Sequence, residues 1–414
     1  MSRALMTGNV AAAWGARLAN VDYIPAFPIT PQTEIIETLA SWVDEGLVDA
    51  KLTMLESEHS MVTAAGAAAA TGARVFTATS SQGLLYALEM LYAVAGWRVP
   101  FVMVNVSRGV ASPITLEPDH EDILAARDSG FLQLHAATCQ EVVDFVLLGY
   151  ALGEDPRVRL PVLVNEDGFQ LSFTREPVAL PAASDIAELL GTFDPMGSAL
   201  RGGNPTSQGI AVLDPSAYSY FRYEIHLASR AALAAWDEVA VSFAEITGRR
   251  YEPVEVYRAD DAEVAIVAIG SFSTKLKEAV DRLRDAGQRV GLVRPLLLRP
   301  FPDAQLREAL AGKKGVLVFD QNLSMGKGGV LHTEVCSALY GARGAPPIVA
   351  SFIGGLGGRD LPSEEIYAMV DETLAAVQRG EAPPPRLLFT HRELTQQRRL
   401  QVIAGVERAK GGAP

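Results

Sequence analysis

Cysteine and basic charge are scarce in this chain of 414 residues. Only Cys139 and Cys336 are present, whereas an iron–sulfur cluster usually takes four cysteines and a structural zinc site takes four closely spaced ligands. Any redox metal is therefore expected on another chain, and we assign no metal site. Lys and Arg number 36 against 49 Asp and Glu, a net charge of −13 that argues against a nucleic-acid partner.

Long apolar runs are missing as well. The longest, Ala64–Gly72 and Phe145–Gly153, fall short of the roughly 20 residues that a membrane-spanning helix needs, so no span is expected. The N-terminus lacks the basic region, apolar core and cleavage site of a signal peptide. We therefore expect a cytoplasmic protein.

The length and the hydrophobic pattern predict an α/β protein with at least two domains. From residue 1 to about 170, short apolar runs alternate with helical patterns, which is typical of a parallel sheet covered by helices. The predicted strands are Tyr23–Phe27, Lys51–Leu55, Arg74–Ala78, Phe101–Val106 and Leu160–Asn165. The predicted helices are Gly8–Leu18, Pro31–Asp44, Glu58–Ala70, Leu84–Ala95 and Gln140–Leu152.

A different pattern follows. Prolines and glycines interrupt residues 175 to about 215, which predicts an irregular connection before a long helix at Tyr218–Thr247. A second strand–helix alternation begins at Glu263, and a short helix is expected at Arg392–Ile403. The predicted organisation is a first domain at 1–175, a connecting segment at 176–255, a second α/β domain at 256–365, and a C-terminal helix and tail at 366–414.

Thr30 lies between two prolines where the first predicted strand ends. Ligands of open parallel sheets bind outside the carboxyl ends of the strands, which makes Thr30 a candidate contact. The alternative is that Thr30 only caps a helix beginning at Pro31, and the local sequence favours capping.

The segment Leu55–His59 places two acids and a histidine after the next predicted strand. A carboxylate there, from Glu56 or Glu58, could take part in proton transfer. The alternative is structural, because acidic residues at a helix start are stabilised by the helix dipole.

Arg108 directly follows an apolar strand, where its guanidinium could bind a substrate carboxylate through two hydrogen bonds. An ion pair with Asp119 or Asp122 that only holds the loops together explains Arg108 equally well. His120 has acidic neighbours, but no ligand spacing around it is diagnostic of a metal.

Taken in order, these segments resemble the pyruvate:ferredoxin oxidoreductase family and, more broadly, the thiamine-diphosphate-dependent 2-oxoacid:acceptor oxidoreductases. The resemblance covers about residues 5 to 365. The matching segments are Gly8–Ala12, Phe27–Pro31, Glu56–His59, Thr77–Leu84, Arg108, Asp119–His120, Ile123–Gly130, Arg299–Pro302 and Gly354–Asp360. No single motif would suffice, but the ordered set is specific.

The resemblance implies a thiamine-diphosphate-binding-type parallel-sheet domain for the cofactor's pyrimidine ring, followed by a transketolase C-terminal-like α/β domain. Glu58 then resembles the acid that bonds the aminopyrimidine nitrogen and favours the form that deprotonates the thiazolium carbon. Glu56 is the second candidate, and Pro28 and Ile29 would lie beside the cofactor.

Substrate contacts follow from the same resemblance. Thr30 and Arg108 resemble the family's contacts to the carbonyl and carboxylate ends of a 2-oxoacid, and His120 is a further substrate-binding candidate.

Two features of that family are missing from the sequence. The Gly-Asp-Gly motif for diphosphate and magnesium is not found, since Glu166–Phe169 is no substitute, and the cluster-binding cysteines are absent. The resemblance therefore implies the alpha-type chain of a split enzyme. A beta-type partner would hold the diphosphate and Mg²⁺, and iron–sulfur and gamma-type subunits would pass electrons to ferredoxin or NAD.

The implied reaction is oxidative decarboxylation of a 2-oxoacid with coenzyme A, which yields acyl-CoA and CO₂. Pyruvate is the first expectation, and branched-chain acids, 2-oxoglutarate and aryl acids such as phenylglyoxylate share the machinery. A transketolase or dehydrogenase E1-like component is an alternative, although it would lack the Phe27–Pro31 turn. A non-catalytic scaffold subunit is another, against which the presence of Thr30, Glu58 and Arg108 counts.

Overall fold

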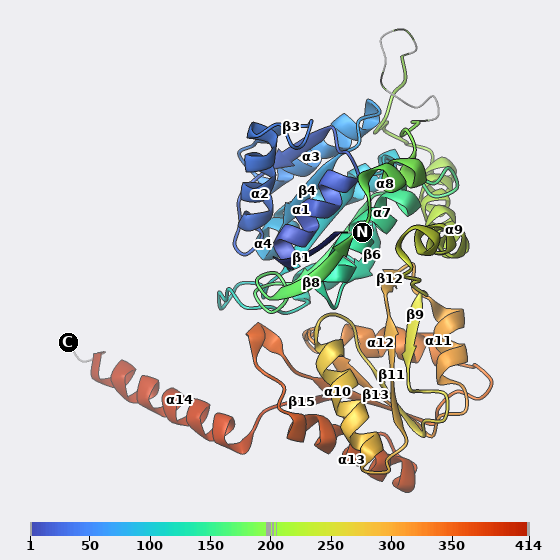
Figure 1. Cartoon of the computed structure of the whole chain (residues 1–414). Coiled ribbons are helices and arrows are strands. Elements are labelled where there is room, and N and C mark those ends of the chain that lie inside the picture. Colours follow the sequence, from blue (N-terminus) through green and yellow to red (C-terminus); the bar gives the residue numbers. More distant parts are fainter. Residues whose placement is uncertain (1, 196–199, 201–202, 204, 412–414) are drawn as a thin grey trace.

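The computed structural model describes residues 2–195, 200, 203 and 205–411. One sheet is built mainly from the N-terminal half of the chain and another from the C-terminal half, and helices flank both (Figure 1). Most strand pairs within these two sheets are parallel, so the predicted α/β class is confirmed. None of the helices described combines the length and the apolar character that crossing a bilayer requires.

The first sheet has the strand order β12-β6-β7-β5-β4. Its strands are β4 Phe76–Thr79, β5 Val102–Ser107, β6 Leu132–His135, β7 Val162–Asp167 and β12 Leu297–Arg299. A parallel pair, β2 Tyr23–Ala26 with β3 Lys51–Met54, joins the β4 side through a bridge between Tyr23 and Val75. The order β3-β2-β4-β5 in space therefore brings the carboxyl ends of four strands to one edge.

Helices cover both faces of this sheet. They are α1 Gly8–Leu18, α2 Thr33–Asp44, α3 Glu58–Ala70, α4 Ser81–Tyr86, α5 Leu88–Trp97, α6 Glu121–Ala125, α7 Cys139–Gly153, α8 Ala183–Leu190 and α9 Pro215–Thr247. Alternate residues of β5 point to opposite faces. Val102 and Val104 pack in the same core as Val146 of α7, whereas Met103 packs with Met61 of α3 and Leu91 of α5.

Local capping explains why two helices begin where the sequence predicts. The hydroxyl oxygens of Thr7 and Ser57 accept hydrogen bonds from backbone amides in the first turns of α1 and α3. The prediction of one helix at Leu84–Ala95 is wrong, because this region forms α4 and α5 with a break at Ala87.

The prediction that the chain after residue 175 is only irregular is wrong in part. Strand β8 Arg175–Leu180 pairs antiparallel with β1 Ser2–Thr7, a strand that the sequence analysis also missed. Pro177 is tolerated because a two-stranded sheet leaves one edge of each strand unpaired. Residues 196–199, 201–202 and 204 of the predicted connection lie outside the described residues.

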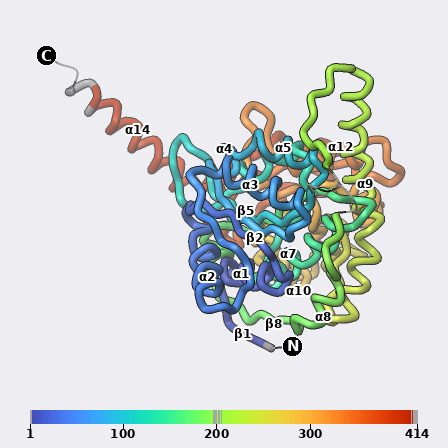
Figure 2. Tube along the Cα trace, turned by 90° about the horizontal axis from the view of Figure 1, so that it is seen from above, coloured from blue at the N-terminus to red at the C-terminus, as the bar shows by residue number. Residues whose placement is uncertain are grey.

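The second sheet has the order β15-β14-β13-β10-β11-β9. Its strands are β9 Val254–Tyr257, β10 Val264–Val267, β11 Val290–Pro295, β13 Gly315–Asp320, β14 Ile348–Ile353 and β15 Arg386–Leu387. Its helices are α10 Phe272–Asp285, α11 Asp303–Leu310, α12 Val330–Leu339, the 3₁₀ turn η1 Leu356–Gly358 and α13 Ser363–Arg379. The last helix, α14 His391–Gly411, is longer than predicted and extends away from both sheets, on the side opposite to α9 (Figures 1 and 2).

The two sheets are joined by a chain segment that passes from β11 of the second sheet to β12 of the first, and by a buried ion pair. After β11 the chain leaves the second sheet, and β12 pairs with β6 of the first. Arg294 of β11, only 1% exposed, donates hydrogen bonds to both carboxylate oxygens of Glu141 on α7, at 2.8 and 2.5 Å. It also donates to Glu255 of β9 at 2.7 Å. The contact between the two sheets therefore depends on the guanidinium of Arg294, which is removed from water but has a carboxylate partner for each of its nitrogen atoms.

We predict that Arg294→Ala lowers the free energy of unfolding by about 3–5 kcal/mol, because Glu141 is left as a buried charge without a cationic partner. Arg157→Ala is the matched control, since Arg157 also pairs with two carboxylates but is 45% exposed. That change should cost at most about 1 kcal/mol. Urea denaturation of both variants measures the difference, and equal losses would show that the ion pair does not hold the two sheets together.

Candidate active site

Four turns follow the four adjacent strands β2, β3, β4 and β5, and the predicted site residues lie on them. Thr30 follows β2, Glu56 and Glu58 follow β3, and Arg108 follows β5. The turn after β4, Ser80–Gly83, lies between them. Because the carboxyl ends of parallel strands share an edge, residues far apart in sequence meet here.

The Thr30 turn is fixed by hydrogen bonds from its surroundings. The Asn9 side chain donates to the carbonyl oxygen of Pro31 at 3.0 Å, and the Gln32 side chain donates to that of Phe27 at 2.8 Å. Thr30 is exposed, and α2 begins only at Thr33 with Gln32 before it. The interpretation of Thr30 as a helix cap is therefore wrong, and its hydroxyl is available to a ligand.

Pro28 and Ile29 lie on the same turn. Pro28 is exposed and Ile29 is half-buried, so both present surface beside Thr30. Their predicted place beside a cofactor stays a prediction.

Arg108 joins this turn to the one after β4. Its side chain is 5% exposed, and Nη1 donates to the carbonyl oxygen of Thr30 at 2.6 Å while Nη2 donates to Oε1 of Gln82. Burial lowers the pKa of Arg108, although Asp122 opposes this, and the group stays charged because its ordinary pKa is very high. The guanidinium bonds neither Asp119 nor Asp122 within the described residues, so the proposed loop-holding ion pair is wrong.

The two acids after β3 have different environments. Glu58, the first residue of α3, is 6% exposed. Glu56 is exposed, and a hydrogen bond from the Ser60 hydroxyl at 2.5 Å lowers the pKa of its carboxyl. Of the two, Glu58 is the acid that faces the interior of the site.

The glycine after β4 allows this close packing. A Cβ atom at Gly83 would lie 2.5 Å from Oε1 of Glu58 and 2.5 Å from Oγ1 of Thr79. The Thr79 hydroxyl is buried and has no hydrogen-bond partner among the described residues. The buried Glu58 carboxylate and the unpaired Thr79 hydroxyl therefore lie close together, and such a pair suits a ring that carries both hydrogen-bond donors and acceptors.

Asp122 fixes the turns after β4 and β5, and the sequence analysis did not identify this role. Its buried carboxylate accepts from the backbone amide of Ser81 at 2.8 Å, from the Asn105 side chain at 3.1 Å and from the backbone amide of Arg108 at 3.3 Å. Burial raises the pKa of Asp122, and these hydrogen bonds oppose the rise. No local pattern sets Asp122 apart from its acidic neighbours.

His120 lies at the contact between the two sheets. It is 1% exposed, and its Nε2 lies 2.6 Å from Oδ1 of Asp167, which also accepts from Ser271 before α10. Burial alone lowers the pKa of His120, but the Asp167 carboxylate raises it above its usual value. The pKa of His135 falls to about 3 because that ring is buried and faces His120. The structure thus gives His120 a partner, Asp167, at the contact between the two sheets. Substrate contact by His120 stays a prediction.

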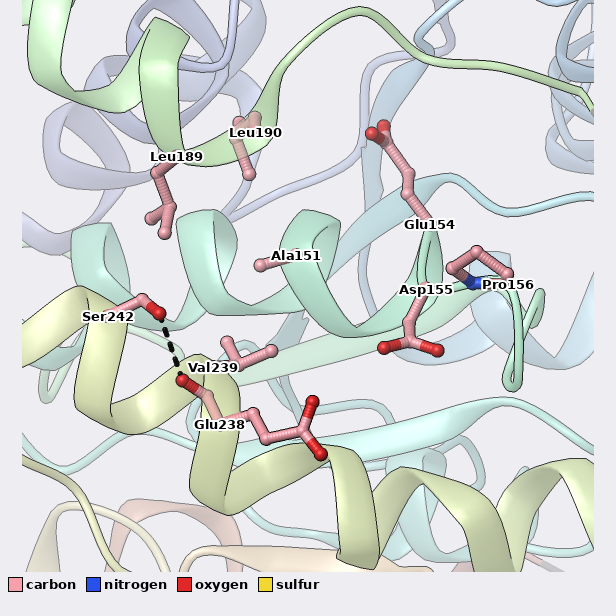
Figure 3. A pocket seen from close by; sticks show the side chains of 9 residues that line it. All are labelled: Ala151, Glu154, Asp155, Pro156, Leu189, Leu190, Glu238, Val239 and Ser242. Carbon is pink, nitrogen blue, oxygen red and sulfur yellow. Dashed lines mark hydrogen bonds between the residues drawn. The ribbon is translucent and has the colours of Figure 1, made fainter.

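The cavity in Figure 3 lies elsewhere, between the end of α7 and helices α8 and α9, with a volume of about 330 Å³. Its acidic side chains already have cationic partners. Glu154 bonds Arg74 at 2.7 Å, and Asp155 and Glu238 both bond Arg157. These carboxylates are committed to ion pairs, so we do not place the chemistry there.

Two family descriptions match successive parts of the chain. Residues 14–243 match the family described as pyruvate flavodoxin/ferredoxin oxidoreductase, thiamine diphosphate-binding, and residues 262–366 match pyruvate:ferredoxin oxidoreductase core domain II. All four turns lie within the first match.

Individual proteins match over most of the chain. Pyruvate synthase subunit PorA of Pyrococcus abyssi is 39% identical over 92% of this chain and 96% of its own length. The same subunit of Methanothermobacter thermautotrophicus is 42% identical over 89% and 94%. Ketoisovalerate oxidoreductase subunit VorA of Pyrococcus horikoshii is 40% identical over 91% and 95%.

Two solved structures share the fold. A 2-oxoglutarate:ferredoxin oxidoreductase from Magnetococcus marinus, solved with 2-oxoglutarate, coenzyme A and succinyl-CoA, superposes with a TM-score of 0.71 at 23% identity. The similarity covers 90% of this chain and 65% of that one. A split-gene transketolase, an inactive beta4 tetramer, gives a TM-score of 0.52 at 13% identity over 90% and 99% of the two chains.

The family description matches more than half of the chain, and relatives at about 40% identity match about nine-tenths of it. This chain therefore belongs to the pyruvate flavodoxin/ferredoxin oxidoreductase family.

Proposed function

We propose that this chain is the alpha-type subunit of a cytoplasmic, multi-subunit 2-oxoacid oxidoreductase that converts a 2-oxoacid and coenzyme A to acyl-CoA and CO₂. The observation that carries the proposal is that a buried acid, Glu58, and the Arg108–Thr30 pair follow strands that lie side by side, β3-β2-β4-β5, at one edge of the sheet. An acid for proton transfer and a cation for a carboxylate are the groups that such a substrate needs from this side of the site.

Thiamine diphosphate fits the residues after β3 and β4. Glu58 would bond the pyrimidine ring, with the unpaired Thr79 hydroxyl close by because residue 83 is a glycine, and Pro28 and Ile29 would lie beside the ring. Glu56 is the second candidate for the acid, but it is exposed. When bound, the cofactor supplies the nucleophilic carbon and the electron sink that decarboxylation requires.

The chain's own residues control binding and protons. Arg108 would bind the substrate carboxylate, because its guanidinium is held in place by Thr30 and Gln82. The exposed hydroxyl of Thr30 would donate to the keto oxygen. Glu58 would hold a proton at its carboxylate, away from bulk water.

A beta-type partner would supply the remaining contacts. The acids of the Glu166–Phe169 turn do not suit a diphosphate-bound Mg²⁺, because Asp167 is bonded to His120 and Ser271. Burial raises the pKa of Glu166 well above its usual value, which favours its neutral form. With two cysteines in the chain, iron–sulfur clusters would belong to iron–sulfur and gamma-type subunits that pass electrons to ferredoxin or NAD.

Pyruvate is the substrate we propose first, since the PorA subunits are named for it. A branched-chain acid is the second candidate, because VorA of Pyrococcus horikoshii is as similar to this chain as the PorA subunits are. Aryl acids such as phenylglyoxylate would use the same carboxylate site with a different side-chain pocket.

We predict that Glu58→Gln lowers turnover of the assembled complex by roughly 10²- to 10⁴-fold, because an amide cannot take up or release the proton. Glu56→Gln is the matched control, since it makes the same change two residues away at an exposed side chain, and it should stay near wild type. Steady-state kinetics, with gel filtration to verify assembly, compares the two. If Glu56→Gln is the inactive variant, Glu58 is not the acid.

For Arg108→Ala we predict a KM that rises roughly 10- to 100-fold for every 2-oxoacid tested, because a charged hydrogen-bonding partner of the shared carboxylate is lost. Arg108→Lys should recover only part of the affinity, since an ammonium keeps the charge but cannot reproduce the planar set of donors that bonds Thr30 and Gln82 and leaves Nε for the substrate. KM values for pyruvate, 2-oxoisovalerate and phenylglyoxylate test this. Unchanged KM values would make Arg108 a structural residue.

A further inference from the structure

We propose that Gln82 is a second substrate-binding residue, whose side-chain amide donates a hydrogen bond to the carboxylate that Arg108 binds. The inference rests on the proposed function. It starts from two buried N–H donors, on side chains that bond each other, for which the described part of the chain offers no partner.

The oxygen and the nitrogen of the Gln82 side chain have different environments. The oxygen accepts from Nη2 of Arg108, which fixes the orientation of the carboxamide because a guanidinium only donates. The Ser81 hydroxyl lies 2.6 Å from the same oxygen and 2.8 Å from the carbonyl oxygen of Gly109, and it can donate its one proton to either. The Gln82 nitrogen Nε2 is buried and has no hydrogen-bond partner among the described residues. The donor face of Gln82 is therefore free, although its acceptor face is used by Arg108.

The nitrogen atoms of Arg108 also differ in their environments. Nη1 and Nη2 donate to Thr30 and Gln82, whereas Nε is buried and unpaired within the described part of the chain. Nε2 of Gln82 shares a carbon with the accepting oxygen, and Nε of Arg108 shares a carbon with the donating Nη2. Covalent geometry thus keeps both free donors within a few ångström of the hydrogen bond between Arg108 and Gln82.

Two such donors need an acceptor. A buried donor without a partner is unfavourable, and folded proteins leave few of them. An ionised carboxylate only accepts hydrogen bonds, and its two oxygens can take one bond from each donor. A 2-oxoacid carboxylate has this chemistry, and the neighbouring Thr30 hydroxyl would then meet the keto oxygen.

The backbone of Ser81, the residue before Gln82, indicates that its surroundings fix the direction in which the Gln82 side chain points. Ser81 has a φ of 50°, a left-handed conformation that non-glycine residues rarely adopt. It is held there by the hydrogen bond from its backbone amide to the buried carboxylate of Asp122, at 2.8 Å. Strained backbone fixed in this way is found preferentially at functional sites.

Gln82→Glu separates substrate binding from a purely orienting role. The carboxylate still accepts from Arg108, but the free donor is replaced by a negative acceptor. We expect KM for pyruvate and for 2-oxoisovalerate to rise by the same factor, roughly 10- to 100-fold, with a smaller change in kcat. The dissociation constant of oxamate, which carries pyruvate's carboxylate on a non-reacting amide, should rise in parallel when measured by calorimetry.

Gln82→Met removes both functions and should weaken binding at least as much. Gln378→Glu, which makes the same charge change at an exposed position of α13, should leave KM unchanged. All measurements use the assembled fraction from gel filtration and include thermal unfolding. An inactive wild-type complex would refute the proposed function itself. An active wild type, with KM and oxamate affinity of Gln82→Glu within about twofold of it, would overturn the role of Gln82 alone.

Discussion

Arg108 donates one hydrogen bond to the backbone of Thr30 and another to the side chain of Gln82, and this pair of bonds ties together the turns after three strands. The guanidinium is nearly buried, so its position is set by these acceptors rather than by solvent. Asp122 fixes the backbone at both Ser81 and Arg108 from the other side. The site is therefore organised before any substrate arrives, which is the condition for using binding energy on the reaction.

The rest of the fold supports this edge of the first sheet. The second sheet contributes β12 to the first, and Arg294, Glu141 and Glu255 pair where the two meet. Asp167, at the end of β7, is likewise committed to His120 and Ser271 in that contact. The strand ends after β2 to β5 thus carry the groups available to a ligand, whereas the end of β7 holds the two sheets together.

Much of the fold could be predicted from the sequence because its signals are local. Helices α1 and α3 begin where Thr7 and Ser57 cap them, and the apolar runs of β5 and β7 mark buried parallel strands. Six strands were not predicted: β1, β6, β8, β9, β12 and β15. Of these, β1, β8 and β12 pair with strands far away in sequence, and no local pattern reveals the pairing. For Thr30, the local sequence alone favoured a helix cap because the prolines around it resemble a helix start, whereas α2 begins only at Thr33.

Several residues of the candidate site could be predicted from the sequence, but the hydrogen bonds between them could not. Thr30, Glu58 and Arg108 stand out at strand ends, yet their roles rested on a family resemblance and remain to be tested. Gln82 could not be singled out, because its significance comes from hydrogen bonds to Arg108, 26 positions later in the chain. The roles of Asp122 and His120 likewise depend on contacts that form only in the folded chain.

The central claim is that this chain supplies only one side of a shared cofactor site, and titration with thiamine diphosphate tests it most directly. Isothermal calorimetry of the purified chain with Mg²⁺ should detect no tight binding, because the groups for the diphosphate are missing. The chain assembled with the beta-type partner that we propose should bind the cofactor stoichiometrically, and Glu58→Gln should weaken that binding. Submicromolar binding by the isolated chain would contradict the account.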